Sequence, residues 1–96
     1  MYDKDVPYEW DPNKATENLQ KHGVRFSEAV GVFSDEAAIT IKDDDDDTNE
    51  ERFVTLGVGL KGRILAVVYC YRDDRIKIIS ARTAGRPERE EYEAQR

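Results

Sequence analysis

The chain has 96 residues, 39% of them hydrophobic, and carries a formal net charge of −6 at pH 7. This length suffices for one domain with a modest core, so a single domain is expected over residues 1–96. No apolar run approaches the roughly 20 residues that cross a membrane, and the first ten residues lack the apolar core of a signal peptide. Length and composition therefore predict a cytoplasmic protein with no membrane partner.

The charge is divided unevenly along the chain. Residues 1–60 contain six Lys and Arg against fifteen Asp and Glu, whereas residues 61–96 contain nine against six. A net acidic protein binds nucleic acid poorly without a specific site. We therefore expect any contact with phosphate to be local and to involve the basic C-terminal part.

Helix signals follow a short extended segment at residues 8–10. Asp11 is a good N-cap, Pro12 suits the first helical position, and Gly23 is a typical C-terminal stop. These three residues predict a helix over residues 12–22.

The next stretch predicts a second helix, a strand and an acidic connector. Ser27 is expected to cap a short helix, with Phe26 before it as a hydrophobic staple. A candidate strand covers residues 37–41. Five consecutive aspartates, Asp43 to Asp47, follow it, and their repulsion predicts an extended connector. Their alternating spacing could suggest a calcium loop, but the glycine and glutamate that such a loop needs are missing.

The C-terminal part predicts a three-stranded meander followed by a helix. Apolar runs rich in β-branched and aromatic residues cover residues 52–59, 64–71 and 76–81. Tight-turn signals, Lys61-Gly62 and Asp73-Asp74, separate them.

A charged segment at residues 84–96 predicts the last helix, with Pro87 in its first turn and Tyr92 as its main apolar anchor. The predicted elements together indicate an α+β fold. It has two N-terminal helices, a mainly antiparallel four-stranded sheet and a C-terminal helix.

Two-residue turns would fix the strand register and therefore the two faces of the sheet. With Arg72 opposite Arg75 and Leu60 opposite Arg63, most large apolar residues share one face, which can seat helices. That face is expected to carry Val54, Leu56, Val58, Leu60, Leu65, Val67, Tyr69, Tyr71, Ile76 and Ile78, with Arg52, Arg63, Ser80 and Arg82 toward its ends. The other, smaller and partly cationic face is expected to carry Phe53, Thr55, Gly57, Gly59, Ile64, Ala66, Val68, Cys70, Arg72, Arg75, Lys77, Ile79 and Ala81.

Common catalytic motifs are missing from the sequence. It contains no phosphate-binding glycine loop, nucleophile elbow or zinc spacing, and only one His and one Cys. We therefore expect no metal site and no cofactor. Cys70 lies within a predicted strand and is interpreted as a small buried hydrophobe.

Arginines gather instead at the ends of predicted strands and helices. They are Arg52, Arg63, Arg72, Arg75, Arg82, Arg86 and Arg89. Each could simply pair with a neighbouring acid. Several on one sheet, however, suit a phosphodiester ligand, because guanidinium groups bind phosphate oxygens bidentately.

Longer motifs resemble those of the BrnT toxins. The resemblance rests on EWDPNKATENLQKHGVRFSEAVGVFSD, EER, GRILAVVYCYR and IKIISARTAGRPEREEYE, which follow in this order between residues 8 and 93. It implies a RelE-like fold and the toxin half of a bacterial type II toxin–antitoxin pair. It also implies a ribonuclease that cleaves RNA and blocks translation. A BrnA-type antitoxin would neutralise it, and operator DNA would be reached only through that antitoxin.

Metal-free RNA cleavage requires a base, an acid and stabilisation of the charge that develops when the 2′-hydroxyl attacks phosphorus. Arg63, Arg72 and Arg82 are candidates for the charge stabilisation, with Arg63 and Arg82 expected diagonally on one face. RNA binding is expected from Arg52, Arg75, Lys77, Arg86 and Arg89.

For the proton transfers, the resemblance points to basic and tyrosine side chains, which leaves Tyr92, Lys77 and His22 as candidates. Histidine is the residue type that titrates near neutrality. At the end of a helix, His22 has an equally good structural role as a cation facing the helix C-terminus.

A second class of function stays open, namely a catalytically inactive toxin-like module that acts with its antitoxin in transcriptional autoregulation. The acidic net charge and the lack of an obvious base favour this module. The retained arginines favour the ribonuclease.

Overall fold

A computed structural model of the chain describes residues 7–43 and 51–95. In chain order the elements are β1 (Tyr8–Glu9), α1 (Pro12–His22), α2 (Phe26–Ala29), the 3₁₀ helix η1 (Val30–Ser34), β2 (Ile39–Asp43), β3 (Arg52–Val58), β4 (Ile64–Arg72), β5 (Arg75–Thr83) and α3 (Arg86–Ala94). Apart from Asp43, the acidic connector and the calcium-loop interpretation lie outside the described residues. None of the helices in the described part of the chain is long and apolar enough to cross a membrane.

In the described residues the sheet has five strands in the order β1-β5-β4-β3-β2, which corrects the expected four. β1 adds to the edge of β5 in parallel, with Tyr8 opposite Ile76 and Glu9 opposite Lys77, whereas the other neighbours are antiparallel. The sheet is therefore mixed. The extended segment before α1 becomes a strand because its backbone bonds to β5, as in the 2.6 Å bond from Ile76 N to Pro7 O.

The first helix begins and ends where its caps predict. The Asp11 side chain accepts a 2.9 Å hydrogen bond from Asn13 N, and Gly23 has the left-handed φ of 69° that ends helices. The second helix differs from the expectation. Its N-cap is Arg25, not Ser27, and a single α-turn passes directly into η1.

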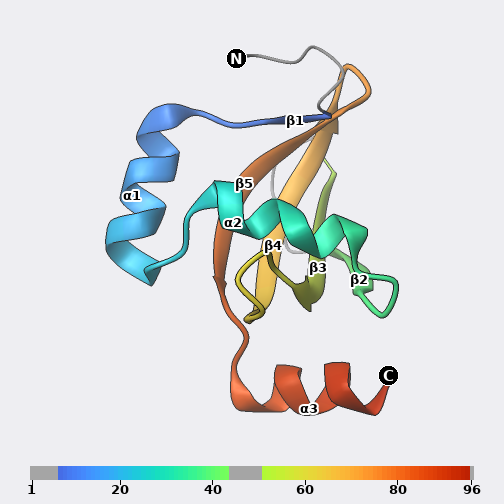
Figure 1. The fold of residues 1–96 in the computed structure, drawn as a ribbon. Coiled ribbons are helices and arrows are strands. Elements are labelled where there is room, and N and C mark those ends of the chain that lie inside the picture. The colour runs from blue at the N-terminus through green and yellow to red at the C-terminus, as the bar shows by residue number, and fades with distance from the viewer. Residues whose placement is uncertain (1–6, 44–50, 96) are drawn as a thin grey trace.

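The second helical segment packs closely on the β3–β4 connection. Leu60 N donates to Glu28 O at 3.0 Å, and a Cβ added at Gly31 would lie 2.6 Å from Leu60 N. Only glycine permits this approach of one backbone to another. Figure 1 shows α2 and η1 crossing one face of the sheet, with α1 beside it and α3 below.

The main core lies between that face and the helices. Its buried members are Val24, Phe26, Ala29, Val32, Leu65, Val67, Tyr69, Ile78 and Ala81. Tyr69 anchors the aromatic part, with ring centroids 4.8 Å from Phe33 and 5.8 Å from Phe53.

The β4–β5 register agrees with the expectation near the turn and departs from it at a bulge. Arg72 pairs with Arg75 and Tyr69 with Ile78, across Asp73-Asp74, whose positive φ angles suit a tight hairpin. Next, Val68 pairs with Ser80, so Ile79 is an extra residue. The faces expected for Ser80, Ala81 and Arg82 are therefore wrong. Ala81 points into the core, and Ser80 and Arg82 point away from it.

The faces expected for β3 are wrong along the whole strand. Val58 pairs with Ile64, which leaves a five-residue connection closed by a 2.9 Å bond from Gly59 N to Arg63 O. A two-residue turn would have shifted this pairing by one residue. Consequently Phe53 and Thr55 face the helices, and Arg52 faces the other side.

The last helix lies across the lower end of the sheet in Figure 1. Its Tyr92 is buried, and the hydroxyl donates to the Asp35 carboxylate, which also accepts from Val58 N at 2.9 Å. On the sheet face away from α2, a small second cluster contains Leu56, Ala66 and Ala84.

Candidate active site

The bulge and the five-residue connection bring cations onto one face of the sheet. We call the face opposite α2 and η1 the open face (Figure 1). By strand alternation from the observed register, it carries Arg52, Arg72, Arg75, Lys77 and Arg82. Two-residue turns predict Arg52 and Arg82 on the other face, so the cationic surface is larger than expected.

Two adjoining hollows form a groove between α1 and β5. One, of about 150 Å³, is lined by Asp11, Lys14, Arg52, Cys70, Lys77, Ile78 and Ile79. The other, of about 140 Å³, is lined by Lys14, Glu17, Asn18, Lys21, His22, Ile79 and Ser80. Because Lys14 and Ile79 line both, we treat them as one site and call it the α1–β5 groove.

The groove is predominantly cationic. Four Lys or Arg side chains outnumber its two acids, Asp11 and Glu17. Cys70 is 1% exposed, as its interpretation as a buried hydrophobe requires, and contributes to the groove lining between Arg52 and Lys77. Such a groove can hold an anionic ligand such as phosphate.

The groove unites three sequence-predicted residues, Arg52, Lys77 and His22, with two that sequence reasoning missed, Lys14 and Lys21. A signal for these two exists in the sequence. Lys14, Asn18 and Lys21 follow helical spacing and form one polar stripe along α1.

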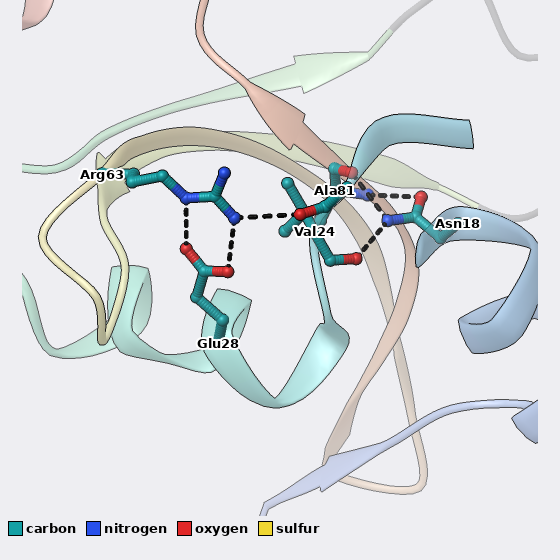
Figure 2. A network of polar contacts seen from close by, with 6 residues as sticks. Asn18, Val24, Glu28, Arg63 and Ala81 are labelled. Atoms are coloured by element: carbon teal, nitrogen blue, oxygen red, sulfur yellow. Dashed lines mark hydrogen bonds and ion pairs between the residues drawn. The ribbon is translucent and has the colours of Figure 1, made fainter. Parts of the chain in front are cut away.

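Asn18 fixes α1 against β5. Its side-chain Nδ2 donates to Ala81 O at 2.7 Å and to Val24 O at 3.0 Å, and its Oδ1 accepts from Ala81 N at 3.1 Å. Figure 2 shows this amide between the helix and the strand. The side chain is buried. Two of its bonds reach Ala81 of β5, and the third reaches Val24, just after the end of α1.

Arg63 lies on the other side of the sheet, where it binds Glu28 and Gly23 in a contact that we call the clamp. Its guanidinium donates to both Glu28 oxygens, at 2.8 and 2.6 Å, and to Gly23 O at 3.1 Å (Figure 2). The hydrogen bonds from Arg63 lower the pKa of the buried Glu28 carboxyl and in turn raise the pKa of Arg63. Arg63 and Arg82 therefore do not share a face, contrary to the expectation.

Arg82 is held at the start of α3. Its two Nη atoms donate to the Glu88 carboxylate at 2.7 and 2.9 Å, and Gly85 N donates to the same group at 2.8 Å. The Arg82 hydrogen bonds, aided by Gly85, lower the pKa of Glu88 to about 2. Arg82 is not among the residues that line the groove, and its proposed catalytic role stays a prediction.

The remaining predicted residues lie outside the groove. Tyr92 is 1% exposed within the core. Arg72 is exposed at the end of β4, and Arg75 lies 3.3 Å from Glu9 and donates to Tyr8 O. On α3, Arg86 bonds to Glu90 and Arg89 to Ala84 O, each at 3.1 Å. Their assigned roles are likewise untested predictions.

Within the described ranges, no three His, Cys, Asp or Glu side chains gather as metal ligands would. Nor, among those residues, does an acid pair with Lys14, Lys21 or Lys77. The chemistry available in the groove is therefore charge stabilisation by Lys and Arg, and proton transfer by His or Lys.

Comparisons with known proteins identify the family and the fold. The family described as "Ribonuclease toxin, BrnT, of type II toxin-antitoxin system" matches residues 10–88. Among solved structures, the crystal structure of the Brucella abortus ribonuclease toxin BrnT is similar, with a TM-score of 0.66 and 23% identity. The match covers 84% of this chain and 99% of that one, and at this identity it supports the fold alone. A search of the curated proteins found no matching relative. Because the family match spans most of the described residues, this chain belongs to the BrnT family of ribonuclease toxins of type II toxin–antitoxin systems.

Proposed function

We propose that this chain is an endoribonuclease toxin that cleaves RNA in the α1–β5 groove and so inhibits translation. The observation that carries the proposal is the gathering of Lys14, Lys21, Arg52, Lys77 and His22 around one groove. A strip of Lys and Arg binds the RNA backbone independently of sequence. The overall negative charge keeps this binding local.

In the proposed reaction, Arg52 and Lys77 hold the scissile phosphate. His22 accepts the proton of the 2′-hydroxyl, whose oxygen attacks phosphorus, and the bond from phosphorus to the 5′-oxygen breaks. Lys14, which lines both hollows, donates the proton that the leaving oxygen takes. The products are a 2′,3′-cyclic phosphate and a free 5′-hydroxyl.

The proposal gives the remaining predicted residues other tasks. Arg63 and Tyr92 hold the helices, through Glu28 and Asp35. Arg82 fixes α3 through Glu88. Arg72, exposed on the open face, extends the positive surface beyond the groove.

We propose that cleavage needs no metal. The cationic lining supports this idea, because Lys and Arg repel a divalent cation and can themselves stabilise a phosphorane. The test is cleavage of a labelled RNA oligonucleotide by the purified chain, in EDTA and in Mg²⁺, followed by end-group analysis. Equal rates and 2′,3′-cyclic phosphate ends are expected. Products ending in 3′-hydroxyl groups, or cleavage only with Mg²⁺, would contradict the proposed mechanism.

We further propose that a BrnA-type antitoxin neutralises the toxin by covering the open face and competing with RNA. The face supports this because it combines half-buried apolar residues, such as Val68 and Ile79, with a basic groove. Hydrogen exchange of the toxin with and without its antitoxin should show protection concentrated in residues 61–93, above all in β5, and extending to the neighbouring α1. Protection confined to α2 and η1 would show that inhibition follows another route.

Induced expression of the chain should arrest bacterial growth, and the purified protein should cleave RNA. Neither arrest nor cleavage would instead favour the inactive module that acts with its antitoxin in autoregulation, and arrest without cleavage would contradict RNA cleavage as the cause of toxicity.

A further inference from the structure

The edge of β5 changes neighbour along its length. β1 pairs with it only at Ile76 and Lys77, and the following part of the strand lies beside α1. At Ala81 the missing strand is replaced by a side chain, because the Asn18 amide accepts from Ala81 N and donates to Ala81 O. A neighbouring strand would supply the same donor and acceptor. Asn18 is thus a strand substitute built into a helix.

The geometry of this contact is restrictive. Asn18 is 6% exposed, and its remaining amide donor is used by Val24 O, after the end of α1. Both amide groups therefore have partners, and a shift of the helix along the strand would break bonds that water cannot replace in a buried site. The contact fixes where α1 lies along β5.

We propose that Asn18 is a positioning residue for the α1–β5 groove, an inference that rests on the proposed function. Lys14 lies one turn before it on α1, and His22 lies one turn after it, so the helix presents both about 12 Å apart along its axis. β5 supplies Lys77 and Ser80 from the other wall. By fixing one wall against the other, Asn18 sets the position of His22 relative to the phosphate-binding cations without touching RNA itself.

This role explains why Asn18, which takes no part in the proposed reaction, stands in the same segment as His22. In the segment NLQKHG, Asn18 anchors the helix, His22 projects from its last turn, and Gly23 ends it. The spacing of four residues keeps Asn18 and the His22 imidazole about one turn apart, on one side of α1.

The proposal is tested with Asn18→Leu, which keeps the number and branching of the side-chain heavy atoms but has no hydrogen-bonding groups. Gly31→Ala is the matched control, because it destabilises the distant contact between η1 and Leu60 and leaves the groove intact. Both are compared with wild type at a temperature where each is fully folded. Single-turnover cleavage of an RNA oligonucleotide and binding of the uncleavable 2′-deoxy analogue are measured.

Asn18→Leu is expected to lower the cleavage rate by about 10²-fold, the effect of a misplacement of roughly 1 Å. Binding of the analogue should change less than threefold, since the cations remain, and Gly31→Ala should retain the wild-type rate. An equal loss of rate in both variants, or a rate within threefold of wild type for Asn18→Leu, would overturn the proposal.

A second variant and a second measurement keep the test decisive. If Asn18→Leu does not fold, Asn18→Ser replaces it, because its hydroxyl can still bond to Ala81. Asn18→Ser should lower the cleavage rate by less than the roughly 10²-fold expected for Asn18→Leu. Nuclear Overhauser contacts between α1 and β5, measured without RNA, should weaken or move in either variant. Unchanged contacts would overturn the positioning role. A wild-type protein that does not cleave RNA would instead overturn the proposed function, and the contacts would still report on Asn18.

Discussion

The two faces of the sheet use charged residues in different ways. On the face covered by α2 and η1, Arg63 is bound to the buried Glu28, and this pair joins α2 to the β3–β4 connection. On the open face, Lys77 has no acidic partner among the described residues and lines a groove with Arg52. Composition alone does not separate these uses. A cation that an acidic side chain contacts holds the fold together, whereas a cation without such a contact can bind a ligand.

Removal of a groove cation should have the largest effect and should leave the fold unchanged. Lys77→Ala is expected to lower RNA cleavage by about 10²-fold, the usual loss when a group that stabilises transition-state charge is removed. Lys61→Ala, an exposed lysine of the β3–β4 connection, is the control and should cleave normally. Melting temperatures should agree among all three proteins. If Arg82→Ala abolished cleavage and Lys77→Ala did not, the site would lie at the α3 end of the open face.

Removal of Arg63 from its contact with Glu28 should have the opposite effect, a loss of stability without a loss of activity. Arg63→Met leaves the Glu28 carboxylate buried without its partner, so the melting temperature should fall, whereas the cleavage rate of the folded protein should persist. Without Arg63, burial raises the pKa of Glu28, and protonation at low pH relieves the penalty. The deficit relative to wild type should therefore shrink as the pH falls. A deficit that grows on acidification would exclude Glu28 as its source.

A change at Gly31 tests the closeness of packing on the covered face. Gly31→Ala improves intrinsic helix propensity, yet its Cβ would meet Leu60 N at 2.6 Å. The overpacking should lower the free energy of unfolding by about 1–3 kcal/mol. Urea unfolding measures this value. The comparison is Gly62→Asn, at a position that, unlike Gly31, has a left-handed φ of 84° and has open space where a Cβ would lie. A stabilised Gly31→Ala would mean that η1 is not held against the hairpin.

The smallest effect concerns the Arg82–Glu88 pair at the edge of the open face. The pKa of Glu88 is lowered from 4.5 to about 2, so its ionised carboxylate stabilises the fold. This stabilisation is fully present above pH 4.5 and is lost as the pH falls from 4.5 to about 2. Solvent screens the pair, so its contribution is about 1 kcal/mol. Glu88→Gln should be less stable than wild type at pH 7, and the two melting temperatures should converge near pH 2. A constant difference across this range would show that the pair does not titrate as stated.

Local signals in the sequence determined most of the elements. Asp11, Pro12 and Gly23 fix α1 because capping and backbone φ depend on a few neighbouring residues. The Asp73-Asp74 hairpin formed as predicted for the same reason. The caps of α1, the three strands of the meander and the last helix could all be predicted without knowledge of tertiary contacts, whereas the cap expected at Ser27 was wrong.

The tertiary structure decided the faces and the partners. The extra residue at Ile79 and the five-residue connection before Ile64 each shift a register by one, and in a sheet a shift of one moves every side chain to the other face. No local signal fixes such a shift, because it depends on which packing buries the most apolar surface. Asn18 and Ala81 are 63 residues apart in the sequence, so their contact, and with it the groove, exists only once the chain has folded.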